Sequence, residues 1–419
     1  MKAVVIGAGV VGVTTAYYLA KSGHQVTVVE KESQAAQLAS GGNAGLIAPG
    51  HSFAWASPSA PAELLRSLTI EDTALRINPL KAPGMAVWGI KFLRECNAER
   101  AVKNTLVKLR LAQYSQRMLE QIAADERIDY DDIHEGLLYL YRDPKRFEAG
   151  IKKMKLLQEH GQKQDVLDPD GVAEAEPALA PVKHKLAGAI YAVTDSSGDS
   201  VKFTRELQAV CERMGSRFVF DTGAKKLVAR GGKVQSALLE NGDSITGDVF
   251  VLAAGVQSPK IARTVGTRLP IAPAKGYSAT FPIKKNGGPM MRVGCVDEEL
   301  LVAWCRMGDR LRMTSSAEFT GYETTYTEHD LRLIRKLATD LLPDAAEYDK
   351  GTYRACNRPM TPDGPPILGT AGHENLFFNS GYGHMGFTMA CGSSRIVADL
   401  IDGKQPELPL KGLTLTSRP

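Results

Sequence analysis

The first thirty residues constrain the fold more than any other part of the chain. Residues 3–6 read AVVI, an apolar run without alternation that is typical of a strand buried on both faces. GAGVVG follows at once and has the spacing GxGxxG. Residues 11–22 then predict a helix, and residues 26–29, VTVV, predict a second buried strand. This order of strand, glycine turn, helix and strand predicts a dinucleotide-binding α/β fold.

Each position of the motif has a physical role in that interpretation. Gly7 permits a tight turn, Gly9 lets the backbone approach a pyrophosphate, and Gly12 lets the helix pack closely on the strand. The N-terminus of the helix presents unpaired N–H groups and the positive end of its dipole to the phosphates. Glu30, at the end of the second strand, can accept hydrogen bonds from ribose hydroxyls. The alternative, a glycine-rich turn that binds nothing, leaves the acid at the strand end unexplained.

A segment of small residues comes after the second strand. Residues 40–45 read SGGNAG, and a segment without bulk can run against a flat cofactor. The alternative is a surface loop. Residues 46 and 47 are apolar and favour a buried segment.

The length of 419 residues favours two domains. Residues 249–255, VFVLAAG, predict a buried strand that returns the chain to the dinucleotide domain after a long excursion. We therefore expect an α/β chain with a discontinuous Rossmann-type domain and an α+β substrate domain built on a mixed or antiparallel sheet with helices. The predicted cofactor domain comprises residues 1–78, 195–268 and 352–419, and the substrate domain comprises residues 79–194 and 269–351.

The last quarter of the chain separates a flavin enzyme from an NAD-dependent one. Glycines 381, 383 and 386 lie between an apolar strand and a helix that begins near Phe387. This second helix N-terminus is suited to a partial negative charge, such as the N1–C2=O edge of a reduced flavin. An NAD dehydrogenase has no use for such an element at the far end of the chain. The sequence therefore favours FAD.

Five segments together resemble the FAD-dependent amine oxidoreductases of the D-amino acid oxidase and glycine oxidase superfamily. The greatest likeness is to the bacterial D-amino acid dehydrogenases (small subunit). The segments are residues 1–30, NAG at 43–45, PAKG at 273–276, NRPMTPDGPPILG at 357–369 and NSGYGHMGFTMACG at 379–392.

The resemblance implies non-covalent FAD and the oxidative deamination of D-amino acids. A hydride passes from the substrate Cα to flavin N5, and the imino acid is released for hydrolysis. It also implies a backbone contact of Ala224 with adenine. The predicted cofactor contacts are Gly7, Gly9, Val10, Val11, Gly12, Glu30, Lys31, Ser40, Gly42, Asn43, Ala44, Gly45, Leu46, Ala224, Ala254, Gly255, Gly383, His384, Met385, Gly386, Phe387 and Thr388.

Four side chains are candidates for the substrate site. Arg358 matches the arginine of the family that grips the substrate carboxylate, and the alternative is a structural salt bridge. Tyr277 falls near a tyrosine that closes the site, and the alternative is a core aromatic residue. His384 places its backbone near the flavin, with proton transfer by its ring as a second hypothesis. His51 stands where the dehydrogenases are expected to have an aromatic residue, often tyrosine, so we hypothesise that it narrows substrate preference.

Several questions stay open at this level. Electrons go to a quinone or another carrier, or to oxygen in an oxidase on the same fold. D-proline or hydroxy-D-proline is an alternative substrate, and a partner subunit is a further alternative. The net charge of +4 and the absence of charge blocks exclude a nucleic-acid binder, and no cysteine spacing indicates a metal.

The expected location is the cytoplasm, because no signal peptide precedes the first strand and no 18-residue apolar run is present. The apolar residues 83–93 would provide a contact with a membrane or a quinone at its inner face, or would pack in the core.

Overall fold

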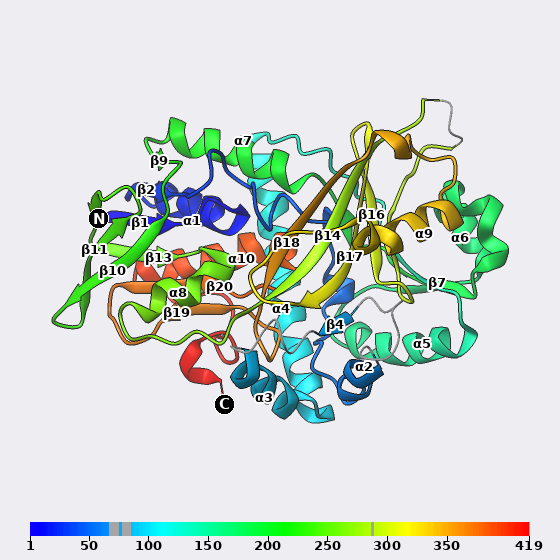
Figure 1. Cartoon of the computed structure of the whole chain (residues 1–419), viewed down its shortest axis with the longest axis horizontal. Coiled ribbons are helices and arrows are strands. Elements are labelled where there is room, and N and C mark those ends of the chain that lie inside the picture. Colours follow the sequence, from blue (N-terminus) through cyan, green and yellow to red (C-terminus); the bar gives the residue numbers. More distant parts are fainter. Residues whose placement is uncertain (67–74, 78–84, 286–288, 419) are drawn as a thin grey trace.

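Two large sheets lie side by side in the molecule (Figure 1). The structure is a computed structural model that describes residues 1–66, 75–77, 85–285 and 289–418. The predicted domain boundary between residues 78 and 79 lies outside the described residues. The division into two discontinuous domains therefore stays a prediction at that point.

The first sheet has six strands in the order β19-β20-β13-β1-β2-β9. All neighbours in it are parallel except β19 and β20. The central strand β1 lies between β2, the next strand in the sequence, and β13, which comes much later in the chain. This change of direction makes a topological switch point at the carboxyl ends of β1 and β13. The strands are β1 (Lys2–Ile6), β2 (Gln25–Val29), β9 (Arg217–Val219), β13 (Val249–Leu252), β19 (Ile367–Thr370) and β20 (Leu376–Ser380).

Helices cover this sheet and two small sheets accompany it. Helix α1 packs against α7 and α10, and Thr15 of α1 and Ser394 of α10 share a buried hydrogen bond of 3.0 Å. The helices are α1 (Val10–Lys21), α7 (Ser200–Arg213), α8 (Ser258–Arg263) and α10 (Gly386–Ile401). The small sheets are β10 (Ala224–Arg230) with β11 (Lys233–Leu239) and β12 (Ser244–Thr246), and β3 (Leu46–Ile47) with β8 (Ser196–Ser197).

The second large sheet is mixed and has nine strands. Its order is β18-β14-β17-β16-β15-β5-β7-β6, and β4 pairs with β17. The pairs β15–β5 and β17–β4 are parallel, and the other pairs are antiparallel. The strands are β4 (Leu75–Ile77), β5 (Leu137–Tyr141), β6 (Asp165–Leu167), β7 (Gly188–Ala192), β14 (Ala272–Pro282), β15 (Gly294–Asp297), β16 (Val302–Met307), β17 (Arg310–Phe319) and β18 (Thr352–Met360).

Most of the remaining helices lie beside this second sheet, whereas α4 packs against α10. The longest described helix, α4, begins after the cap Asn97, whose side chain accepts the N–H of Arg100. One face of α4 buries Val107, Leu111, Tyr114 and Ile122. A 3-10 turn, Glu328–Leu331, leads directly into α9. The helices are α2 (Ala60–Arg66), α3 (Ala86–Glu95), α4 (Ala98–Glu126), α5 (Pro144–Gln158), α6 (Pro169–Ala175) and α9 (Arg332–Leu341).

The expected fold class is confirmed. One mostly parallel α/β sheet carries the glycine turn, and a mixed sheet with helices completes the chain. None of the described helices is long and apolar enough to cross a membrane. All six cysteines are free thiols.

Candidate active site

One cavity of about 1170 Å³ joins the two large sheets. Its walls come from the turn between β1 and α1, the segment of residues 36–48, the end of β13, the start of α10 and the strand β18. The carboxyl ends of β1 and β13 open into it, so it occupies the switch point of the six-stranded sheet.

The glycine turn leaves no room for side chains. Gly7 has φ +108°, and a Cβ there would lie 2.6 Å from the carbonyl oxygen of Ala253. A Cβ on Gly12 would lie 1.8 Å from the carbonyl oxygen of Gly7. The backbone therefore reaches its close approach of strand and helix only with glycine at these positions. Gly12 performs the packing role that its spacing predicts, and it does not line the cavity.

Glu30 is buried at the end of β2 and lines the cavity. One carboxylate oxygen accepts the N–H of Ala8 at 2.7 Å, and the other accepts the N–H of Glu32 at 3.0 Å. Burial raises the pKa of Glu30, and the two backbone hydrogen bonds counter part of that rise. Each carboxylate oxygen has a second lone pair that can accept a further hydrogen bond.

The segment of small residues is packed between the two sheets. The Ser40 hydroxyl accepts the N–H of Val10 at 3.0 Å, so the segment meets the first turn of α1. Arg312 of β17 donates to the carbonyl oxygens of Gly41 and Asn43, both at 2.9 Å. A Cβ on Gly42 would lie 2.4 Å from the Cys356 sulfur. The segment therefore needs small residues on both faces.

The start of α10 forms the opposite wall. Gly383 has φ +58°, a left-handed conformation that glycine adopts readily. The Thr388 hydroxyl accepts the N–H of Ala48 at 3.1 Å and lies 3.2 Å from the Leu46 carbonyl oxygen, to which it can donate. Two helix N-termini, those of α1 and α10, thus border one cavity, and both favour negative charge there.

Arg358 is a residue of strand β18, and its side chain lines the cavity. Its guanidinium covers Gly276 of the neighbouring strand β14, where a Cβ would lie 2.4–2.5 Å from its atoms. Nη1 donates to the carbonyl oxygen of Ser316, a residue with the left-handed φ of +63°. Burial lowers the pKa of Arg358, but a guanidinium stays charged in proteins. Among residues 1–66, 75–77, 85–285 and 289–418, no carboxylate forms an ion pair with it.

His51 lines the cavity and is fixed by its neighbours. Its Nε2 lies 2.9 Å from a carboxylate oxygen of Glu298, and its ring stacks on Tyr139 at 5.0 Å. The Tyr139 hydroxyl donates to Asp195 at 2.7 Å, and Asp195 accepts the N–H of Gly50 at 3.0 Å. Burial raises the pKa of Asp195 to about 7. Burial alone would also raise the pKa of Glu298, but His51 and then other nearby cations hold it below its usual value.

His384 lies beside His51 in the cavity wall. Its ring stacks on Trp55 at 5.1 Å and meets His51 edge-on at 6.2 Å. Burial holds the pKa of His384 well below its usual value, and the charge of Lys108 adds to this effect. The ring is therefore neutral near pH 7.

Tyr277 is buried in β14 and does not line the cavity. Its hydroxyl donates to Glu318 of β17 at 2.7 Å, so it occupies a hydrogen-bonded core position of the mixed sheet. Gly45 is also packed away from the cavity, against Met307 and Gly198. The predicted residues that line the cavity are Gly7, Gly9, Val10, Val11, Glu30, Lys31, Ser40, Gly42, Asn43, Ala44, Leu46, His51, Ala224, Ala254, Gly255, Arg358, Gly383, His384, Met385, Gly386, Phe387 and Thr388.

Sequence reasoning missed four residues that shape the site. Trp55 and Tyr139 line the cavity, Glu298 holds His51, and Arg312 holds the segment of small residues. Trp55 follows His51 by four residues and could have been found as its neighbour in the chain. No local signal marks the other three, because each reaches the site through long-range packing.

Comparison with known proteins identifies the family. The model of the DAO family, described as FAD dependent oxidoreductase, matches residues 2–400. This chain belongs to that family. The oxidoreductase is 40% identical over 415 residues to D-amino acid dehydrogenase 2 of Mesorhizobium japonicum, with 99% of each chain covered. It is 41% identical over 414 residues to D-amino acid dehydrogenase of Paramagnetospirillum magneticum, with 99% and 98% covered.

Solved structures show the same fold for this oxidoreductase at low sequence identity. Glycine oxidase from Geobacillus kaustophilus superposes with a TM-score of 0.77 at 19% identity, covering 99% of this chain and 98% of that one. L-Proline dehydrogenase from P. horikoshii gives a TM-score of 0.73 at 19% identity, covering 99% and 96%.

The cavity of this oxidoreductase fits FAD, the cofactor of its family. Gly7 and Gly12 exclude side chains from the turn where a pyrophosphate would lie, and the buried Glu30 keeps free lone pairs at the end of β2. The N-termini of α1 and α10 add N–H donors for phosphate and ring oxygens, apart from the Val10 N–H, which Ser40 accepts. Among the described residues, no group of three or more His, Cys, Asp or Glu side chains could hold a metal ion.

Proposed function

We propose that this oxidoreductase is a D-amino acid dehydrogenase that oxidises the Cα–N bond of its substrate to an imine. The observation that carries the proposal is the guanidinium of Arg358, a half-buried cation without a carboxylate partner among the described residues, in the cavity of the glycine turn. The names of relatives at about 40% identity over whole chains support the same substrate class.

The residues have separate roles in this proposal. Bound FAD supplies the acceptor for the hydride that leaves the substrate Cα. Glu30, the glycine turn and the cavity-lining residues of the segment 40–46 hold the cofactor, and the start of α10 receives negative charge. Arg358 binds the substrate carboxylate through parallel N–H donors and orients Cα. His51 and Trp55 form the wall that meets the substrate side chain. The proposal includes no dedicated catalytic base.

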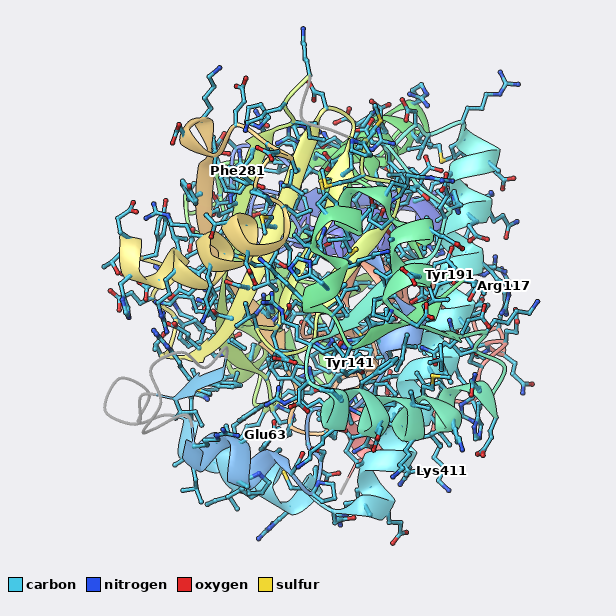
Figure 2. The ribbon with its side chains drawn as sticks, turned by 90° about the vertical axis from the view of Figure 1, so that its right-hand side faces the viewer. Glu63, Arg117, Tyr141, Tyr191, Phe281 and Lys411 are labelled. Atoms are coloured by element: carbon cyan, nitrogen blue, oxygen red, sulfur yellow. The ribbon has the colours of Figure 1, made fainter. Side chains whose placement is uncertain are left out.

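We propose a quinone or another carrier as electron acceptor, and a cytoplasmic location at the inner face of the membrane. Exposed apolar side chains on α3 support this: Val87, Ile90 and Leu93 are 68%, 54% and 53% exposed. Helices α2 and α3 lie together at the lower edge of the molecule in Figure 1, and Figure 2 places Glu63 of α2 at the same edge. Residues 83 and 84 of the predicted apolar segment lie outside the described residues.

The contact with the membrane has its own test. Co-sedimentation of the protein with anionic vesicles is expected to fall when Ile90 and Leu93 are both changed to serine. A partner subunit would appear instead as a second chain that co-purifies with the wild-type protein and is lost in the same variant.

The substrate class is tested by anaerobic visible spectra of the purified holoenzyme. We expect the flavin bands to bleach with D-alanine, D-proline or hydroxy-D-proline and to persist with the matching L-isomers. Readmitted air restores the bands at once in an oxidase, and slowly in a dehydrogenase that needs a carrier. A yellow protein that no D-amino acid bleaches would refute the substrate class. Arg358→Gln is the matched variant, and it should raise the substrate concentration needed for bleaching without loss of bound FAD.

A further inference from the structure

The imidazole of His384 lies in the cavity wall without a hydrogen-bond partner. Nδ1 and Nε2 are both buried, and neither has a partner among the described residues. Buried side-chain polar atoms in folded proteins are nearly always paired. An exception in the wall of a binding cavity indicates that the partner comes with the ligand.

Packing holds this ring in place before a ligand arrives. Trp55 stacks on it with an angle of 22° between the rings, and His51 meets it at 78°. His51 itself already has Glu298 as a partner for Nε2. Both ring nitrogens of His384 are therefore free to bond a ligand, whereas one nitrogen of His51 is already engaged.

The protonation state limits what the ring can recognise. A neutral imidazole has one N–H donor and one lone-pair acceptor. A hydroxyl also donates one hydrogen bond and accepts others, so the two groups are complementary. An ammonium group only donates, and it would lie near Lys108 and Arg358, whose charges already disfavour a cation at His384. A carboxylate only accepts, and Arg358 is the stronger partner for it.

We propose that His384 is a specificity residue that binds a hydroxyl on the side chain or ring of the substrate. The preferred substrates are then hydroxylated D-amino acids. This inference rests on the proposed function, because Arg358 must hold the α-carboxylate for the rest of the substrate to reach His384.

The test compares matched substrate pairs in an assay with an artificial electron acceptor. The pairs are D-serine with D-alanine, D-threonine with D-2-aminobutyrate, and 4-hydroxy-D-proline with D-proline. In the wild-type enzyme we expect kcat/KM to favour the hydroxylated member of at least one pair by roughly ten- to one-hundred-fold. His384→Phe keeps the ring stacked on Trp55 and removes both nitrogens, so it should lower kcat/KM for the hydroxylated member more than for the deoxy member and abolish that preference. His384→Gln, with one acceptor and an N–H donor, should restore part of it.

His373→Phe is the control for the exchange of rings. His373 also has a buried ring nitrogen without a partner among the described residues, but it does not line the cavity. Its substitution should leave every ratio unchanged. Flavin content and melting temperature are recorded for each variant, and an anaerobic spectral titration gives the binding constant of each substrate.

The outcomes separate this inference from the function on which it rests. If D-amino acids bleach the flavin but the wild-type enzyme prefers no hydroxylated member, the inference is wrong and the proposed function stands. The same holds if His384→Phe lowers both members of a pair equally. If no D-amino acid bleaches the flavin, the proposed function is wrong and the inference is wrong with it. If neither variant at position 384 folds, the wild-type ratios decide.

Discussion

A single methyl group at Gly276 should displace Arg358 without unfolding the protein. The Cβ of Gly276→Ala would lie 2.4–2.5 Å from guanidinium atoms, whereas ordinary contacts begin near 3.4 Å. The guanidinium must therefore move by about 1 Å. Because a charge-assisted hydrogen bond contributes about 1.5–3 kcal/mol, we expect the substrate to bind about ten- to one-hundred-fold more weakly.

The same structure predicts that the fold tolerates this change. Gly276 is not in the left-handed region, so alanine fits its backbone conformation. The atoms that the methyl group meets belong to the end of a flexible side chain, which can shift at low cost. We therefore expect the melting temperature to stay within about 4 °C of the wild-type value. FAD content should not change.

The assay is anaerobic titration of the flavin spectrum with a substrate D-amino acid, together with thermal melting. Gly89→Ala is the control, because a Cβ there would have no neighbour within 4 Å among the described residues. Wild-type affinity in Gly276→Ala would show that Arg358 does not bind the carboxylate from its observed position. A large loss of stability would show that the side chain cannot absorb the shift.

Three further predictions concern two residues of the cavity wall and the buried Lys108. His51→Ala should change the ranking of substrates by kcat/KM, because it removes the ring beside the substrate and its hydrogen bond to Glu298; an unchanged ranking would contradict this role. Glu30→Ala should weaken FAD about tenfold in a fluorescence titration, since a buried acceptor is lost; equal affinity would exclude Glu30 as a cofactor ligand. Burial lowers the pKa of Lys108 to about 7, so between pH 7 and 10 the folded chain holds fewer protons there than the unfolded chain, and the free energy of unfolding should rise with pH. This rise is at most about 1.4 kcal/mol per pH unit. Lys108→Met should reduce this dependence on pH in urea titrations at pH 7, 8 and 9. An unchanged dependence would show that a group other than Lys108 takes up the proton on unfolding.

The parts of the fold that sequence predicts are those with local signals. Strand β1, helix α1 and strand β2 follow one another within thirty residues. Each is marked in the sequence by its pattern of apolar residues and by the residues that end it. The nine-stranded sheet gives no such signal. Its strand β5 pairs with β15, more than 150 residues further along the chain, and β15 supplies only four residues, Gly294–Asp297. Pairing of that kind depends on the whole core.

The site divides in the same way. Arg358 and the glycines belong to motifs that are continuous in sequence, and the structure brings them into one cavity. Glu298 lies in the acidic run DEEL at 297–300, which is typical of a solvated turn, yet it meets His51. Tyr277 shows the opposite case. It follows the family motif PAKG, which predicts a site residue, but its hydroxyl donates a hydrogen bond to Glu318 within the sheet. Contacts between distant side chains decide both cases.

Arg312 couples the stability of the mixed sheet to that of the cofactor cavity. It belongs to β17 of the mixed sheet, donates to Thr280 at 2.8 Å, and holds two carbonyl oxygens of the segment that borders the cofactor cavity. Release of that segment would leave the buried Nη1 of Arg312 without an acceptor, which is costly. Cofactor loss and melting of the mixed sheet should therefore coincide in one cooperative transition. A fragment without β17 would be unable to retain flavin even with its glycine turn intact.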